Sequence, residues 1–278
     1  MIEAGTLTWH AVDGSIVGPA LMAGLLVLAT HVPLGLQVLR KGIVFIDLAV
    51  AQIAGLGVIV ADMLGWEPQG WGVQGAAMAA ALLAAALLTW MERRWPDIQE
   101  ALIGTLFVLA SSAGILLLAG NPHGGEHLKD LLVGQILWVT PGQLQAMAAL
   151  TVLVLAGWFG LGARLGQAGF YVLFALAVTA SVQLVGVYLV FSSLIIPALA
   201  VRRASTRWRL PLAWCLGALG YGGGLWVSAL LDLPSGAVVV MALALVGVLG
   251  AAFLPAGMRD QDMSQRQPSP GEPHRDTP

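Results

Sequence analysis

The sequence predicts an all-α membrane protein, a polytopic bundle of about eight to nine transmembrane helices. Of its 278 residues, 58% are hydrophobic and only 10% are charged, and the mean hydropathy is +0.84. Soluble domains carry about 25% charged residues, so this composition excludes an ordinary soluble protein. Apolar runs recur along the chain at about the 20-residue length that a helix needs to cross a bilayer. Basic residues gather at alternate ends of these runs, as expected for a chain with several spans.

The apolar runs predict nine helical segments. Helices are expected because a helix satisfies its own backbone hydrogen bonds in lipid, and no run alternates in the manner of a barrel strand. The seventh segment is short and contains Pro197, so a broken or re-entrant hairpin with the sixth is an equal alternative to two clean spans. The expected segments are residues 16–39, 43–64, 75–91, 101–119, 144–161, 170–185, 186–201, 210–231 and 235–254.

Lysine and arginine set the expected orientation, because loops rich in these residues stay in the cytoplasm. They follow the first, third, fifth and seventh segments, whereas acidic residues lie at the other ends. We therefore expect an extracytoplasmic N-terminal segment (1–15), a transmembrane region (16–256) and a disordered cytoplasmic tail (257–278). Residues 1–15 contain no Lys or Arg, so the first run is expected to be a retained span rather than a signal peptide.

Several classes of function are disfavoured by what the sequence lacks. The single cysteine, Cys215, excludes an internal disulfide framework. No basic cluster is large enough to follow nucleic-acid phosphates. No GxxxxGK[ST] loop is present, so a pump built on this chain needs its ATPase on another chain. No HExxH, GxSxG or paired-aspartate motif supports an intramembrane enzyme.

Asp47 is the first candidate functional residue, because a carboxylate within an apolar run is costly in a membrane and usually functional. A helix that continued from Lys41 would place Asp47 about 9 Å further on. The functional interpretation is a cation ligand or a gate, with Gln52 five residues beyond. The structural interpretation is an acid that reaches the interface or caps a helix.

His31 is the second candidate, about 13 Å before Arg40 in the first run. If residues 40–41 close a hairpin, His31 and Asp47 lie at comparable depth on facing helices. An imidazole and a carboxylate together suit zinc, manganese or iron. Equally, a lone histidine near a proline can simply hydrogen bond a backbone carbonyl.

Two loops are weaker candidates. The extracytoplasmic stretch 121–130 carries His123, Glu126 and His127, which can capture a cation from a delivering protein or be incidental surface residues. The cytoplasmic stretch 92–104 carries charges and a tryptophan, which suit either the docking of a cytoplasmic partner or ordinary anchoring.

Four stretches together carry a family resemblance: PLGLQVLRKGIVFIDLAVAQIAGLG, IGTLFVLASSAGILLL, HLKDLLVGQILWVTPGQL and VQLVGVYLVFSSLIIPALAVRR. They resemble the membrane permeases of the zinc/manganese/iron class of ATP-binding-cassette (ABC) importers. The resemblance implies a permease dimer in the bacterial cytoplasmic (inner) membrane, two cytoplasmic ATPase subunits and an extracytoplasmic metal-binding protein. It implies a divalent metal ion as cargo, no permanently bound cofactor, and no enzymatic activity on this chain.

The sequence departs from that family pattern at two places. Asp47 matches the acid of the family's D-x-x-x-H pattern, but the histidine position is Ala51. We hypothesise that His31 substitutes for it, or that the cargo is not a bare zinc or manganese ion. The cytoplasmic segment 162–169 is also short, so either the ATPase-docking element is reduced or residues 92–100 and 202–209 share its role. A secondary cation transporter coupled to protons through Asp47 and His31 is the alternative.

Overall fold

The structure is a computed structural model, and it describes residues 14–67, 70–118, 132 and 134–253. In this part of the chain there are nine α-helices and no strands, which confirms the predicted all-α bundle. Eight helical segments are long and apolar enough to cross a membrane, and α8 is shorter. The helices are α1 (Gly14–Lys41), α2 (Ile46–Met63), α3 (Trp71–Arg94), α4 (Gln99–Leu118), α6 (Pro141–Ala156), α7 (Gly162–Val185), α8 (Val187–Ala200), α9 (Thr206–Leu231) and α10 (Ser235–Phe253). Short helical turns η2 (Pro96–Ile98), η3 (Ile136–Trp138) and η4 (Gly157–Leu161) lie between them.

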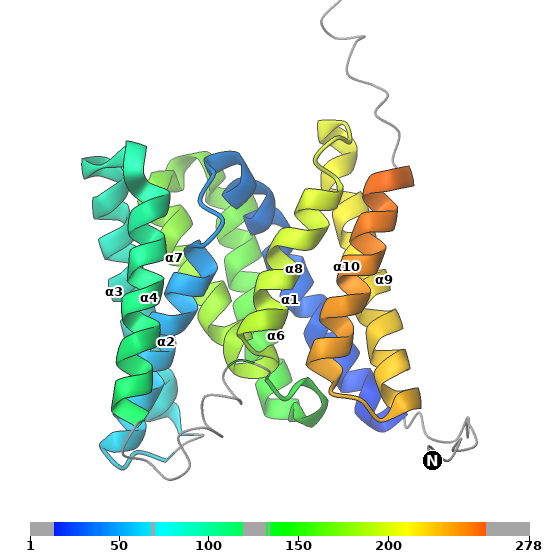
Figure 1. Cartoon of the computed structure of the whole chain (residues 1–278), viewed down its shortest axis with the longest axis horizontal. Coiled ribbons are helices and arrows are strands. Elements are labelled where there is room, and N and C mark those ends of the chain that lie inside the picture. Colours follow the sequence, from blue (N-terminus) through cyan, green and yellow to red (C-terminus); the bar gives the residue numbers. More distant parts are fainter. Residues whose placement is uncertain (1–13, 68–69, 119–131, 133, 254–278) are drawn as a thin grey trace, which may run out of the picture.

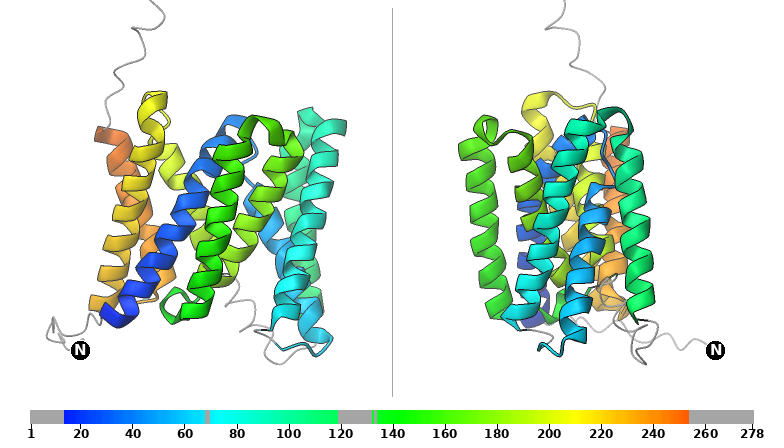
Figure 2. Two further views of the ribbon diagram at one scale, coloured as in Figure 1. Left: turned by 180° about the vertical axis from the view of Figure 1, so that it is seen from behind. Right: turned by 90° about the vertical axis from the view of Figure 1, so that its left-hand side faces the viewer.

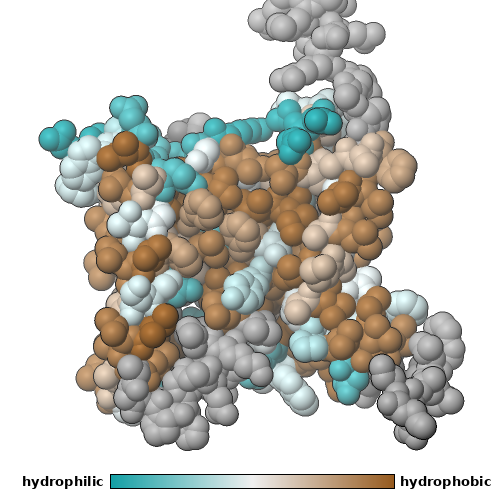
Figure 3. Space-filling view, viewed as in Figure 1, coloured by the Kyte–Doolittle hydropathy of each residue, from teal (hydrophilic) through white to brown (hydrophobic). Residues whose placement is uncertain are grey.

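The helices stand roughly parallel or antiparallel to one axis, and the basic turns lie at one end (Figure 1). That end holds the last turns of α1 and α3, with their basic pairs, and the first turn of α9. A broad apolar band covers the middle of the visible face, with hydrophilic residues along the upper edge (Figure 3). We call the upper end the cytoplasmic end, in accordance with the positive-inside rule.

α7 lies in the middle of the bundle. It is the most buried of the eight possible spans, with 67% of its most apolar stretch inside the protein. It contacts α1, α2, α3, α6 and α8, so it joins the two sides of the molecule. On one side α2 packs against α3 and α4, and on the other α8, α9 and α10 pack together with α1.

α7 and α8 diverge as a V from Gly186 at the extracytoplasmic end (Figure 1). Gly186 has φ 80° and ψ 162°, a conformation open to glycine but strained for other residues. Gly134 approaches the same point so closely that a Cβ on it would overlap the Val185 carbonyl carbon and the Gly186 nitrogen. The expected break near residue 186 is therefore present, as a single-residue joint between two helices.

α1 and α2 do not form the hairpin that the sequence suggested. The chain turns at Gly42, and the two helices then diverge, so that α1 packs mainly on α8, α9 and α6 while α2 packs on α3 and α4 (Figure 2). α7 and α8 each contact both α1 and α2 and occupy the space between them. The expectation of two facing helices was wrong, because neighbours in the chain were taken to be neighbours in space.

A buried tyrosine fixes α1, α8 and α9 together. The ring of Tyr221 (α9) fills the space beside Gly24 (α1), where a Cβ would lie 2.3 Å from the ring. Its hydroxyl lies 2.8 Å from the Ser193 hydroxyl of α8. Ser193 donates its one hydrogen to the Leu189 carbonyl at 2.6 Å, so Tyr221 must be the donor in the contact between the two hydroxyls.

Candidate functional site

Asp47 lies in the first turn of α2 and is only 1% exposed. It shares a buried face of the helix with Val50, Ala51 and Ala54. The first turn of a helix is a favourable place for a carboxylate, because the positive end of the helix favours an anion. One carboxyl oxygen, Oδ1, is buried without a hydrogen-bond partner among the described residues. The carboxylate is therefore enclosed, with one oxygen left free to bind.

The segment between α1 and α2 is not one helix continuing from Lys41, because the chain leaves the helix at Gly42 and re-enters it only at Ile46. Asp47 therefore lies in the first turn of a separate helix, where it is enclosed by neighbouring helices. Its depth within the apolar slab stays a prediction.

His31 is fully buried in α1, and its two ring nitrogens have different surroundings. Nδ1 lies 2.9 Å from the Val27 carbonyl and 3.0 Å from the Thr30 hydroxyl. A carbonyl only accepts, so we assign the ring hydrogen to Nδ1 and the lone pair to Nε2. Nε2 is buried and has no hydrogen-bond partner within the part of the chain that the structure describes. Histidines that bind metals commonly have this arrangement, with one nitrogen bonded to a backbone carbonyl and the other available.

The structure does not place His31 and Asp47 on packed helices. Between α1 and α2 lie α7 and α8. Along the described chain, α7 carries two further buried hydroxyls without hydrogen-bond partners, those of Thr179 and Ser181. Thr151 of α6, which packs on both α1 and α7, has a third. Across α1, α2, α6 and α7, a set of polar atoms is thus buried and unsatisfied, which native interiors usually avoid.

The remaining predicted site residues contribute less to this set. Gln52 is partly exposed and lies about 140° around α2 from Asp47. His123, Glu126 and His127 lie outside the described residues. Within residues 14–67, 70–118 and 134–253, no three His, Cys, Asp or Glu side chains are grouped closely enough to hold a metal ion. Any cation bound between His31 and Asp47 therefore needs backbone, hydroxyl or water ligands, or a movement of helices.

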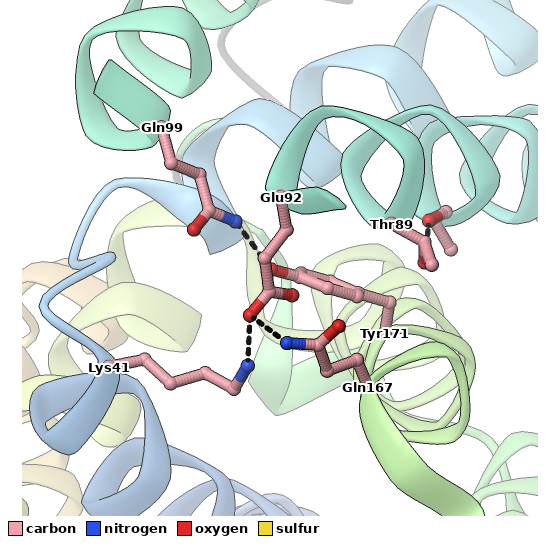
Figure 4. Close-up of polar contacts among 7 residues, drawn as sticks. Lys41, Thr89, Glu92, Gln99, Gln167 and Tyr171 are labelled. Atoms are coloured by element: carbon pink, nitrogen blue, oxygen red, sulfur yellow. Dashed lines mark hydrogen bonds and ion pairs between the residues drawn. The ribbon is translucent and has the colours of Figure 1, made fainter. Parts of the chain in front are cut away.

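A second polar cluster lies at the cytoplasmic end, and the sequence interpretation missed it (Figure 4). Glu92 of α3 pairs with Lys41 of α1 at 2.7 Å and accepts from the Gln167 amide of α7 at 2.9 Å. The Gln99 amide of α4 donates to the Tyr171 hydroxyl of α7. Four helices thus meet at one set of polar contacts.

The rings and the acid beside this cluster extend it. The Lys41 ammonium lies 5.4 Å and 5.6 Å from the ring centroids of Phe170 and Tyr171, within cation–π range. Glu100 of α4 accepts from the Phe45 amide at 3.3 Å, which supplies the cap that α2 lacks from its own chain. The stretch 92–104 therefore ties the α1–α2 turn to the bundle. In the sequence, this cluster was signalled only by the charged residues of stretch 92–104. Their partners could not be identified, because they lie up to 75 residues away in the chain.

Comparison with known proteins agrees with the fold. The model of the ABC 3 transport family matches residues 14–161 and 156–254, which together span nearly all of the described chain. The fold and these matches define a multi-pass membrane protein of the transport-permease class. The chain belongs to the ABC 3 transport family, and the resemblance inferred from the four sequence stretches is confirmed.

Individual relatives are more distant. The manganese transport system membrane protein MntC of Halalkalibacterium halodurans is 28% identical over 181 residues, which cover 56% of this chain and 61% of that protein. The structure is similar to PsaBC from Streptococcus pneumoniae in complex with Fab, with TM-score 0.72 and 19% identity over 92% of this chain and 99% of that chain. It is also similar to an inward-facing metal-chelate type ABC transporter, with TM-score 0.58 and 18% identity over 84% and 82% of the two chains. At these identities, the two solved structures establish a shared fold.

Proposed function

We propose that this chain is the permease subunit of an ABC importer for a divalent metal ion, with manganese as the first cargo to test. The observation that carries the proposal is the family match over both halves of the membrane region. The similarity to a manganese transport protein supports the choice of cargo. Zinc and iron remain the other members of the class to be compared.

We infer that the cargo passes between α1 and α2, beside α7. The supporting observation is that His31 Nε2 and Asp47 Oδ1 are buried, unpartnered and on either side of the α7–α8 pair. The hydroxyls of Thr179 and Ser181 add oxygen ligands on α7. Oxygen ligands suit manganese, and an imidazole suits zinc and iron. In this proposal the cation binds the atoms that have no hydrogen-bond partner in the present conformation.

The proposed partners are two ATPase subunits, an extracytoplasmic metal-binding protein and a second permease chain. ATP hydrolysis would occur on the ATPase subunits, since the sequence has no phosphate-binding loop. At the cytoplasmic end, η2 and the segment after α8 present exposed side chains, including Asp97, Arg202 and Arg203. These surfaces are suited to docking a soluble subunit, in place of the short segment at residues 162–169.

The proposal is tested by reconstitution. The chain is co-expressed with neighbouring ATPase and binding-protein candidates and placed in vesicles that enclose ATP. Radioactive manganese and the binding protein are added outside, with zinc and iron as competitors. We expect manganese accumulation that requires ATP and the ATPase subunits. Accumulation driven by a pH gradient in vesicles without ATP would contradict the proposal and indicate a proton-coupled carrier.

A further inference from the structure

A cavity of about 160 Å³ opens at the cytoplasmic end between α1, η4 and α9. Two arginines line it, Arg40 from the last turn of α1 and Arg209 from the first turns of α9. Its described lining contains no acidic residue. The other lining residues combine polar side chains with apolar and aromatic ones: Pro33, Leu36, Gln37, Trp158, Phe159, Thr206 and Leu210.

The arginines are positioned for an anionic ligand. Arg209 is half-buried, and its Nε donates to the Ala204 carbonyl at 2.9 Å, which holds the guanidinium in place while its terminal nitrogens remain donors. Arg40 is exposed at the rim. Guanidinium groups keep their charge in proteins and match the oxygens of a phosphate in pairs. A cavity of this volume has room for a phosphate group and its first ester carbons.

Below the cavity, α1 carries a stripe of mostly apolar residues between α6 and α9. α1 packs on both α6 and α9, which do not pack on each other along the described chain, so α1 forms the floor between them (Figure 2). The α1 residues of this stripe recur every three or four positions and end at the cavity lining, where Pro33 is buried. They are Met22, Leu25, Ala29, Pro33, Leu36 and Arg40. Met22 is 55% exposed and Leu25 is 41% exposed. The whole stripe is about 27 Å long, which is more than one leaflet of a ~30 Å bilayer.

We propose that this cavity binds the phosphate headgroup of an anionic phospholipid from the cytoplasmic leaflet, with one acyl chain along α1 between α6 and α9. The charge of the cavity, its position along the membrane normal and its shape all favour this ligand. Two cations lie at the level of the cytoplasmic headgroups, which are rich in anionic lipid. Trp158 and Phe159 lie where aromatic side chains meet the interface. The mostly apolar stripe of α1 below the cavity suits a lipid acyl chain and would contribute nothing to the binding of a free ion.

The proposal is tested on the complete chain in detergent by native mass spectrometry, with phosphatidylglycerol and phosphatidylcholine of identical acyl chains as probes. We expect phosphatidylglycerol to bind more tightly. Each arginine contributes about fivefold, so Arg40→Gln/Arg209→Gln should weaken phosphatidylglycerol binding about 25-fold and leave phosphatidylcholine binding unchanged. Arg40→Lys/Arg209→Lys keeps the charge, so its affinity for phosphatidylglycerol should lie between those of the wild type and the glutamine variant.

The matched control is Arg202→Gln/Arg203→Gln, which removes two exposed charges from the same end of the molecule without altering the cavity lining. An equal loss in this control would overturn the proposal in favour of general surface attraction. Competition by glycerol phosphate as strong as that by phosphatidylglycerol would overturn it in favour of a free-phosphate site. Loss of ATPase-subunit binding by the cavity variant in lipid-free detergent, relative to the wild type, would overturn it in favour of a protein-docking site. Thermal unfolding in phosphatidylcholine nanodiscs establishes that each variant is folded.

Discussion

Lys41, the last residue of α1, forms an ion pair of 2.7 Å with Glu92 near the end of α3, and the two side chains are only 19% and 12% exposed. The pair connects the two sides of the bundle at the cytoplasmic end, where α1 and α3 belong to different packing groups. The second carboxyl oxygen of Glu92, Oε2, is buried without a hydrogen-bond partner among residues 14–67, 70–118 and 134–253. Lys41 and Gln167 both bond the other oxygen, Oε1, and Lys41 is the cation that balances its charge.

Removal of the Lys41 charge alone should therefore lower the free energy of unfolding more than removal of the Lys41 and Glu92 charges together. Lys41→Met leaves the Glu92 carboxylate enclosed without its cationic partner, and we expect a loss of about 2 kcal/mol in the free energy of unfolding. Lys41→Met/Glu92→Gln should recover part of that loss. The measurement is reversible unfolding in mixed micelles for the wild type, both single variants and the double variant. Additive losses would show that the two side chains do not interact.

Asp47→Asn should reduce manganese uptake at least tenfold in the reconstituted system while the protein remains folded. The amide keeps the size of the side chain but cannot supply the negative oxygen that a divalent cation needs at Oδ1. Asp62→Asn is the control, because it makes the same change on the same helix at the extracytoplasmic end. Uptake at the wild-type rate with Asp47→Asn would remove this residue from the proposed path.

His31→Ala should weaken uptake more than His123→Ala or His127→Ala does. The available Nε2 of His31 is enclosed in the bundle, whereas the other two histidines belong to the polar stretch 121–130 of the sequence. Thr30→Val supplies a second comparison, since it removes the hydroxyl beside Nδ1 but leaves the Val27 carbonyl bond. Uptake rates and folded yield are measured together. The reverse order of effects would move the cation site to the outer loop.

Ser193 and Tyr221 should respond asymmetrically to loss of their hydroxyls. Tyr221→Phe leaves Ser193 bonded to Leu189, so the loss in stability should be about 1 kcal/mol or less. Ser193→Ala leaves the Tyr221 hydroxyl buried without an acceptor, and the loss should reach about 1–3 kcal/mol. Tyr188→Phe, at a side chain that is 54% exposed, is the neutral control. Equal losses at the two positions would contradict the donor assignment.

The helices were well predicted because their signal is local. Apolar runs interrupted by charged turns located all nine α-helices to within a few residues at most ends, and the break at Gly186 was marked by the short seventh segment. A bilayer enforces such regularity, since each span must be apolar and must satisfy its own backbone. The same regularity hides which helices are neighbours.

The predictions that were wrong or missing were those that depend on tertiary packing. The separation of His31 from Asp47 follows from the insertion of α7 and α8 between two helices that are consecutive in the chain. The bond from Gln99 to Tyr171 joins residues that are 72 positions apart, and neither residue stands out within its segment. Single polar residues such as Thr151 and Thr179 were visible in apolar runs, but only their burial without partners distinguishes them.

The contact between Gly134 and the Val185–Gly186 joint has a consequence for how this chain tolerates change. These two positions are 52 residues apart in the sequence. A methyl group on Gly134 has no space while Val185 and Gly186 keep their present backbone, and the positive φ of Gly186 strains any side chain there. A substitution at either glycine should therefore require the backbone to move at both positions. In a library of variants, these two sites should behave as a single locus, with survivors that either keep both glycines or alter the loop and the helix joint together.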